Sequence, residues 1–168
     1  VQDSAGNVYG TTDGGGTPCR GSCGVVFKVD LNGAESVLYS FNGTDGFGPQ
    51  AGLVLDPAGN LYGTTVLGGY RYRQHGVVFK VDQNGNESVV HSFTGKDGDR
   101  PQADLIRDAA GVLFGTTYGG GVSNDGVVFK LYPGGFETVL HSFNGTDGKN
   151  PAAGLIRDTA GNLYGTTT

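Results

Sequence analysis

The side chains that could carry chemistry in this chain are few, and most of them recur at a regular spacing. One exception is the segment YRYRQH, in which Tyr70, Arg71, Tyr72, Arg73 and His75 stand nearly side by side. Tyrosine and arginine are enriched at binding hot spots, and the amphipathic tyrosine ring suits stacking. We interpret this segment as a candidate binding site for a glycan or a surface protein; the alternative is an ordinary exposed loop.

Three aspartates recur in loops that read TDG or KDG, namely Asp45, Asp97 and Asp147. Carboxylate oxygens are ligands that Ca²⁺ prefers, so a ring of them around a central mouth is a weak metal candidate. The second interpretation is an Asp-Gly turn in which the carboxylate accepts nearby backbone N–H groups. Recurrence in every repeat, with no further oxygen ligands close by, favours the turn. We therefore expect no bound metal and no cofactor.

The two cysteines, Cys19 and Cys23, lie in one Gly-rich loop with the sequence CRGSC. They do not supply the four ligands of a structural zinc site, and their spacing is not that of a redox Cys-x-x-Cys pair. We favour a short local disulfide over two free thiols. Such a bridge would shape the loop more than it would stabilise the fold, and it would imply an oxidising compartment.

A catalytic constellation is not visible in the sequence, because no nucleophile and base stand at a distinctive spacing. His91 and His141 occupy the repeat position of Tyr39, and we interpret them as residues on a sheet surface. The chain is therefore predicted not to be an enzyme, with a hydrolase or lyase as the least favoured alternative. A net charge of −5 with scattered Lys and Arg excludes nucleic acid as a partner, and no apolar run is long enough to span a membrane.

These side chains are positioned by a repeat of about 50 residues. The phrase GNLYGTT occurs at 59–65 and 161–167, with near copies at 6–12 and 111–117. The connections DPAGN and DQNGNE suit tight hairpins. Four antiparallel strands in each repeat are typical of one blade of a β-propeller, an all-β fold. In one repeat the runs that are rich in Val, Leu, Tyr, Phe and Thr, as strands are, cover 51–56, 60–65, 76–82 and 87–93.

The combined pattern GNLYGTT, GVVFKVD, VLYSFNGTDG and PxAGLVLD resembles the GloVer tandem repeat, a choice-of-anchor tandem repeat family of bacterial extracellular proteins. The match covers essentially the whole chain. The resemblance implies a propeller-like fold and a secreted or cell-surface location, and it implies no reaction. A looser similarity to NHL-type propeller repeats implies that 51–56 is the innermost strand of its blade and 87–93 the outermost.

The strand runs divide one repeat domain, residues 1–168, into about three blades of an incomplete ring. These are a partial blade at 1–41, complete blades at 51–93 and 103–143, and a partial blade at 153–167. Propellers have four to eight blades. Three blades alone would expose blade faces and strand edges that drive association. Because the chain starts at Val1, inside a blade, we expect the remainder of a longer propeller, or completion by copies as a homo-oligomer or filament.

These observations favour a non-enzymatic extracellular or cell-surface module with a structural or adhesive role, which self-associates through open blade ends. The alternative is a carbohydrate- or protein-binding propeller that uses its loop face. In an up-and-down blade, the loops between the second and third strands open on the same face as the loops between blades. Function tends to lie on loops that a rigid scaffold holds, so this face is the place to expect a ligand.

Overall fold

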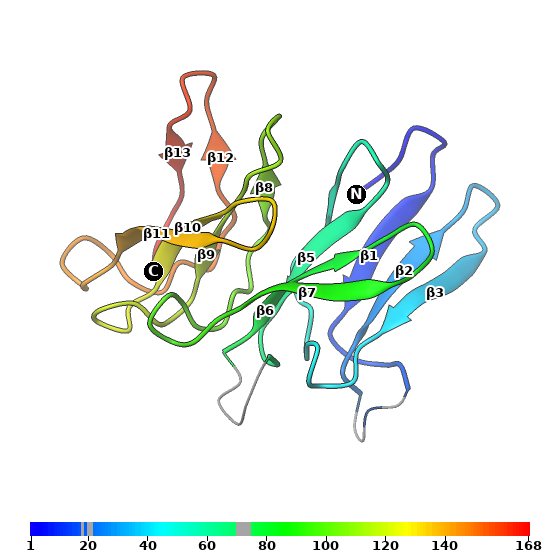
Figure 1. Cartoon of the computed structure of the whole chain (residues 1–168), viewed down its shortest axis with the longest axis horizontal. Helices are drawn as coiled ribbons and strands as arrows, with labels where there is room; N and C mark the ends of the chain where they lie inside the picture. The colour runs from blue at the N-terminus through cyan, green and yellow to red at the C-terminus, as the bar shows by residue number, and fades with distance from the viewer. Residues whose placement is uncertain (18, 20–21, 70–74) are drawn as a thin grey trace.

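The computed structural model describes residues 1–17, 19, 22–69 and 75–168, and in this part of the chain every regular element is a β-strand. The strands form antiparallel sheets that stand side by side (Figure 1). The first blade is β1 (Val8–Thr12), β2 (Val25–Val29) and β3 (Glu35–Ser40). The second is β4 (Val54–Leu55), β5 (Leu61–Thr65), β6 (Val77–Val81) and β7 (Glu87–Ser92). The third is β8 (Ile106–Arg107), β9 (Leu113–Thr117), β10 (Val127–Leu131) and β11 (Glu137–Ser142). The terminal hairpin is β12 (Ile156–Arg157) and β13 (Leu163–Tyr164).

The predicted all-β fold of four-stranded blades is confirmed. The strands of each blade pair in chain order, so β4 and β7 are the two edges of the second blade. The inner strand is shorter than the expected 51–56, since β4 covers two residues. The reason is that the preceding backbone is bonded to other blades. The Thr11 hydroxyl of the first blade donates to the Ala51 carbonyl at 2.8 Å, and the Gly52 N–H donates to the Asp104 carboxylate at 2.6 Å.

The tight turns between first and second strands are closed by an aspartate. In the second blade, Asp56 Oδ1 accepts the backbone N–H groups of Ala58 at 2.9 Å and Asn60 at 2.8 Å, while Oδ2 accepts the Asn60 amide at 2.8 Å and the Tyr62 hydroxyl at 3.3 Å. Gly59 has φ +80°, which suits glycine. The aspartate before the repeated phrase and the Gly, Asn and Tyr within it therefore belong to one hydrogen-bonded turn. The same bond to the N–H four residues on recurs at Asp3, Asp108 and Asp158.

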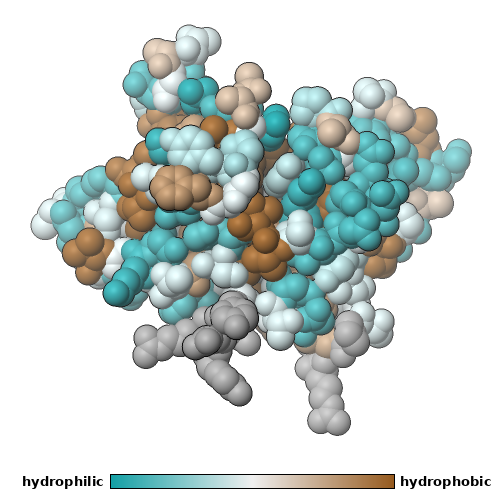
Figure 2. Space-filling view, in the orientation of Figure 1, coloured by the Kyte–Doolittle hydropathy of each residue, from teal (hydrophilic) through white to brown (hydrophobic). Residues whose placement is uncertain are grey.

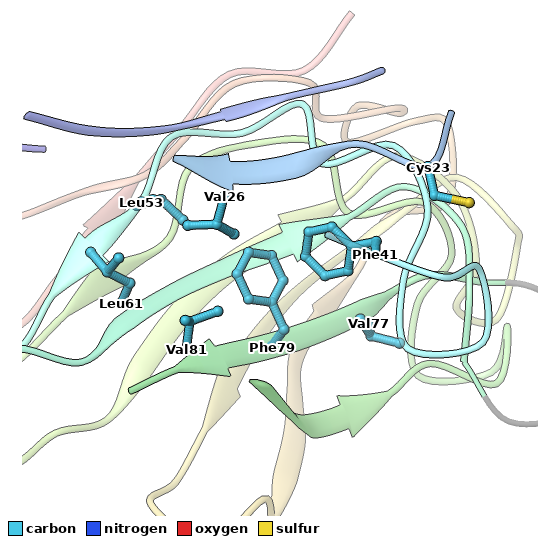
Figure 3. Packing of buried hydrophobic residues seen from close by; sticks show 8 residues of the cluster. All are labelled: Cys23, Val26, Phe41, Leu53, Leu61, Val77, Phe79 and Val81. Atoms are coloured by element: carbon cyan, nitrogen blue, oxygen red, sulfur yellow. The ribbon is translucent and has the colours of Figure 1, made fainter. Parts of the chain in front are cut away.

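The hydrophobic core lies between blades and not within any one of them. Phe79 of β6 packs edge-on against Phe41 of the first blade with ring centroids 5.0 Å apart (Figure 3). Phe129 of β10 packs in the same way against Phe93 of the second blade at 5.2 Å. Adjacent residues of a strand point to opposite faces, so Val78, next to Phe79, is buried in the following interface. The third strand of a blade, such as β6, thus presents a phenylalanine to the blade before it and a valine to the blade after it.

The glycine of the repeated phrase makes room for that phenylalanine. Gly63 and Phe79 are direct partners in the pairing of β5 with β6. A Cβ at Gly63 would lie 2.6 Å from Phe79 Cζ and 2.8 Å from Leu53 Cδ2, which is closer than such atoms approach in proteins. Gly115 has the same relation to Phe129, at 2.7 Å. The sequence GNLYGTT therefore recurs because every interface between blades needs this space.

Candidate functional site

The connections between second and third strands lie beside the connections between blades (Figure 1). Backbone hydrogen bonds join them. Phe47, between the first and second blades, exchanges two such bonds with Leu67 of the second blade at 2.8 and 3.0 Å. Asp99 and Gly119 repeat the exchange one blade later, at 2.9 Å for both bonds. These hydrogen bonds join the loops of the expected loop face into one surface, which we call the platform and which can hold side chains in place.

Of the predicted binding segment, Tyr70, Arg71, Tyr72 and Arg73 lie outside the described residues, and their binding role stays a prediction. His75 is half-buried at the platform, with Nδ1 2.8 Å from Asp99 Oδ1. Arg100 Nε donates to the other oxygen of the same carboxylate at 3.2 Å.

No sequence pattern pointed to Asp99 and Arg100, because their loop differs from the equivalent loops of the other blades. The Arg100 guanidinium lies over the Tyr118 ring, 5.0 Å from its centroid. Together with His75 they join both neighbouring loops of the platform into one polar cluster.

The three recurrent aspartates take part in turns beside the outermost strands. Oδ1 of Asp45, Asp97 and Asp147 accepts the backbone N–H of the residue three positions earlier, at 2.9, 2.8 and 3.0 Å respectively. This is the hydrogen bonding expected of an Asp-Gly turn. The structure thus places these carboxylates along the β3, β7 and β11 side of the blades. They do not ring a central mouth as the metal interpretation expected, because each one contacts the last strand of its own blade.

The second oxygen of each carboxylate contacts the outermost strand. Asp45 accepts the Tyr39 hydroxyl, while His91 Nε2 lies 3.1 Å from Asp97 Oδ2 and His141 Nε2 lies 3.0 Å from Asp147 Oδ2. Burial together with the bond to Asp45 raises the pKa of Tyr39. Burial would raise the pKa of Asp97, but hydrogen bonds from His91 and Thr94 lower it to about 2.

A glutamate from the next blade completes this cluster, and it is absent from the candidate residues that the sequence motifs indicate. Carboxylate oxygens of Glu137 and Asp97 and a ring nitrogen of His91 all lie within 4.8 Å of one another. In the preceding interface, burial and the Asp45 charge raise the pKa of Glu87 to about 7. Burial likewise raises the pKa of Glu137 to about 7. The available signal was the recurrence of glutamate at one repeat position, as the first residue of β3, β7 and β11.

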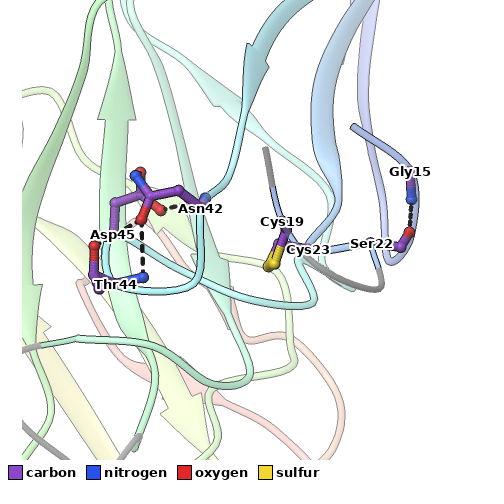
Figure 4. The surroundings of a disulfide bond; sticks show 7 residues. All are labelled: Gly15, Cys19, Ser22, Cys23, Asn42, Thr44 and Asp45. Atoms are coloured by element: carbon purple, nitrogen blue, oxygen red, sulfur yellow. Dashed lines mark hydrogen bonds between the residues drawn. A yellow bond between two sulfur atoms is a disulfide. The ribbon is translucent and has the colours of Figure 1, made fainter. Parts of the chain in front are cut away.

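The predicted disulfide between Cys19 and Cys23 is confirmed (Figure 4). Cys23 is fully buried in the first interface, and its carbonyl accepts the N–H of Gly48 at 3.0 Å. The following blades have other side chains at this position but make the same bond, from Arg100 to His75 at 2.9 Å and from Asn150 to Asp125 at 2.7 Å. The backbone bond that fixes this loop is therefore made in all three blades, and the first blade has the disulfide in addition. The disulfide indicates a non-reducing environment.

A cavity of about 380 Å³ opens between the third blade and the terminal hairpin. We call it the open cavity. Its apolar lining includes Val128, Phe143, Leu155 and Gly165. Figure 2 shows hydrophobic surface around the base of the hairpin that rises at the left of the view.

The open cavity repeats the two filled interfaces without their phenylalanine. Phe79 is surrounded by Val26, Phe41, Leu53 and Gly63. Phe129 is surrounded by the residues at the same repeat positions, Val78, Phe93, Leu105 and Gly115. The open cavity is lined by the residues at the same positions one repeat later, which are Val128, Phe143, Leu155 and Gly165. A Cβ at Gly165 would meet Leu155 Cδ2 at 2.8 Å and, among the described residues, no aromatic ring. The open cavity therefore has the same residue types that enclose Phe79 and Phe129 in the two filled interfaces.

Comparison with known proteins agrees with this architecture. A family model described as the Gloeobacter/Verrucomicrobia repeat matches residues 1–168, which confirms the resemblance drawn from the sequence. No match was found among curated proteins. A similar solved structure is an X-ray structure described as a "putative gluconolactonase". It has a TM-score of 0.60 and 17% identity over 99% of this chain, and this chain spans about half of it, 53%. At that identity the likeness shows the fold alone.

The prediction that the chain is not an enzyme is corrected by this comparison. The solved structure that shares the fold is described as an enzyme, so blades of this kind are not confined to non-catalytic proteins. The prediction was wrong because it relied on the lack of a sequence motif. A propeller assembles polar groups from loops of different blades, and such a set has no fixed spacing in the sequence.

In the described part of the chain, no helix has the length and apolarity needed to cross a membrane.

Proposed function

This chain belongs to the Gloeobacter/Verrucomicrobia repeat family, and from that premise we propose that it is a β-propeller module that assembles with further copies of itself. The contact is made by the open cavity of one copy and the first blade of another. The assembly has a structural or adhesive role outside the cell. The non-reducing environment that the Cys19–Cys23 disulfide indicates supports the extracellular part of this proposal.

One observation carries the proposal: the open cavity has the side chains of two sites that are filled within the chain. Phe79 and Phe129, which fill those sites, are fully buried. Burial of one phenylalanine stabilises a contact by roughly 1.5–3 kcal/mol. An unfilled site leaves the same apolar surface in water, so a matching strand has a favourable place to bind.

The occupant is β2 of a second copy. Phe27 holds the repeat position of Phe79 and Phe129, pairs with Gly10 as they pair with their glycines, and is half-buried at the far end of the chain. One end of the molecule therefore presents a phenylalanine and the other end presents a site for it. Such a head-to-tail contact forms a ring if the rotation closes and a filament if it does not.

The contact produces a composite blade. The terminal hairpin of one copy supplies first and second strands, and the partner supplies its β2 and β3. The partner's β1 and the β13 of the first copy carry nearly the same phrase, GNVYGTT and GNLYGTT. Because β13 pairs with the partner's β2 in the composite blade, the partner's β1 leaves its sheet when the copies join. Gly10 is the partner of Phe27 in the free chain, and Gly165 holds the same position of the phrase in β13, so the same register is expected in the composite blade.

The test is the mass of the chain in solution, measured by light scattering after size exclusion over a range of concentrations. We expect a dimer or larger assembly for the wild type. Gly165→Leu fills the open cavity and Phe27→Asp removes the side chain that enters it, so each variant alone is expected to stay monomeric. Phe136→Asp is the control, because Phe136 is 70% exposed in a tight turn away from the open cavity.

Mixing the two monomeric variants separates a head-to-tail contact from any other. Gly165→Leu keeps an intact Phe27, and Phe27→Asp keeps an intact open cavity. We expect the mixture to form a heterodimer that goes no further, because the remaining ends cannot join. A monomeric wild type at high concentration would refute the proposal, as would variants that assemble like the wild type.

A further inference from the structure

A second recurrent cluster lies at the outer strands and spans each interface between blades. At the interface of the second and third blades it consists of His91, Asp97 and Glu137. The first two residues come from the second blade and the glutamate from the third. His91 Nε2 is 3.1 Å from Asp97 Oδ2, and the three ligand atoms all lie within 4.8 Å of one another. One imidazole nitrogen and two carboxylate oxygens in this space are a ligand set for a divalent transition metal.

We propose that His91, Asp97 and Glu137 bind a divalent transition metal ion such as Zn²⁺, which links the second blade to the third. Zinc accepts imidazole nitrogen and carboxylate oxygen at about 2.0–2.2 Å, so ligand atoms around it lie within about 4 Å of one another. The observed cluster needs a small movement of side chains to reach this geometry. Three protein ligands leave a fourth position for water or for a group of a bound molecule.

The supporting contacts point the right atoms into the cluster. Asp97 Oδ1 accepts the Thr94 N–H and hydroxyl, each at 2.8 Å, which fixes the carboxylate and leaves Oδ2 toward His91. Hydrogen bonds of this type orient the ligands of metal sites. Glu137 Oε1 is buried and, among the described residues, has no hydrogen-bond partner; the same holds for Glu87 Oε1 in the first interface, where a phenol stands in place of the imidazole. A buried carboxylate oxygen without a donor is costly, and a bound cation would satisfy it.

The first interface provides a natural comparison within the same chain. Its cluster is Tyr39, Asp45 and Glu87, with a phenol where the second interface has an imidazole. Tyr39 donates its proton to Asp45, and its pKa is raised by burial and by that bond, so it remains neutral at pH 7. A neutral phenol is a poor zinc ligand, whereas neutral imidazole is a common one. The fold therefore accommodates both the metal-binding and the metal-free version of this cluster.

The open end has two of the three ligands. His141 and Asp147 repeat the pair of the second interface, and their side chains are 49% and 35% exposed. The missing glutamate is Glu35, which holds the repeat position of Glu87 and Glu137 and is exposed on the first blade. In the head-to-tail assembly, Glu35 of the second copy completes this site. This step rests on the proposed function, whereas the site at His91 does not.

The first experiment titrates Zn²⁺ alone into the 168-residue, untagged and chelator-treated Gly165→Leu chain by calorimetry. We expect one ion per chain. His91→Tyr copies the cluster of the first interface, so it is expected to fold and to lose at least about 100-fold in affinity, as befits removal of a direct ligand. Glu137→Gln should weaken binding, and His141→Tyr should leave it unchanged. Co²⁺ should give the visible spectrum of a four-coordinate site in the parent but not in His91→Tyr.

Two results would overturn the site at His91: no saturable binding of either metal, or equal binding by the parent and His91→Tyr. The second experiment counts zinc in the assembled wild type, where two ions per chain are expected. Assembly with one ion per chain would refute the shared site at His141 but not the site at His91. A wild type that stays monomeric and binds one ion would refute the proposed function and leave the site at His91 standing.

Discussion

The interface between the second and third blades and the open cavity beside the third blade are made from the same repeat positions, yet their exposure differs. Gly115 and Thr117 of the phrase GVLFGTT are buried in the interface, whereas the equivalent Gly165 and Thr167 of GNLYGTT are exposed. The strand sequence is almost the same in both places. In the interface a third strand with its phenylalanine pairs with this phrase, whereas at the hairpin the described residues pair no third strand with it. A blade of this repeat therefore obtains its buried core from its neighbour, as expected of repeat architectures.

Removing the phenylalanine from each region should have unequal effects on stability. In the monomeric Gly165→Leu background, we expect Phe129→Ala to lower the free energy of unfolding by about 3–5 kcal/mol, because it empties a fully buried site. Phe27→Ala should cost about 1 kcal/mol, since half of its environment is solvent. Urea denaturation followed by circular dichroism measures both. Equal losses would show that the interfaces between blades are not the core of the protein.

The glycine of the repeated phrase gives a second contrast, with a smaller effect. Gly115→Val places a side chain 2.7 Å from Phe129 Cζ, and overpacking of this kind costs about 1–3 kcal/mol. Gly165→Val meets the flexible end of Leu155, so the monomer should lose less than about 1 kcal/mol. The same denaturation experiment measures the difference. If Gly165→Val were the more damaging variant, the open cavity would not be open in the free chain.

The disulfide sharpens the comparison between blades, because the second and third blades hold the equivalent loop without one. Cys19→Ser should lower stability by about 2 kcal/mol or less, since the bridge closes a loop of few residues. Cys23 is kept, because its side chain is buried. Denaturation of the variant and of the wild type under reducing conditions should give the same midpoint. A loss comparable to that of Phe129→Ala would mean that the first blade depends on the bridge for its folding.

Much of this architecture could be predicted from the sequence, because strands, turns and repeat length all depend on local patterns. The phrase GNLYGTT and the runs of Val and Phe indicate blades, and the CRGSC loop indicates a disulfide. The clusters between blades could not be predicted in the same way. Asp97 and Glu137 are 40 positions apart in the sequence, and their proximity depends on how adjacent sheets twist and pack. The alternation of residues along the outer strand predicts a surface position for His91. Its contact with the Asp97 carboxylate depends on the orientation of the turn between them, which that alternation does not specify.

A change in pH distinguishes Glu87, which is half-buried between blades, from Glu35, which is exposed on the first blade. Burial and the neighbouring Asp45 raise the pKa of Glu87 to about 7, above the ordinary value of 4.5. The folded state therefore binds this proton more tightly than the unfolded state. The contribution to stability is complete below pH 4.5 and is lost as pH rises through about 7. With solvent screening, the loss should be about 1 kcal/mol.

Glu87→Gln keeps the shape of the side chain and removes the charge, so it should be more stable than the wild type at pH 8 and no more stable at pH 4. Tyr39 and Asp45 are the polar groups that face it, and both stay in place in this variant. Glu35→Gln is the exposed control. Denaturation midpoints measured between pH 4 and pH 8, with a chelator present, provide the test. An advantage of Glu87→Gln that is the same at both ends of this range would mean that packing, and not the carboxylate charge, distinguishes the filled interface from the open one.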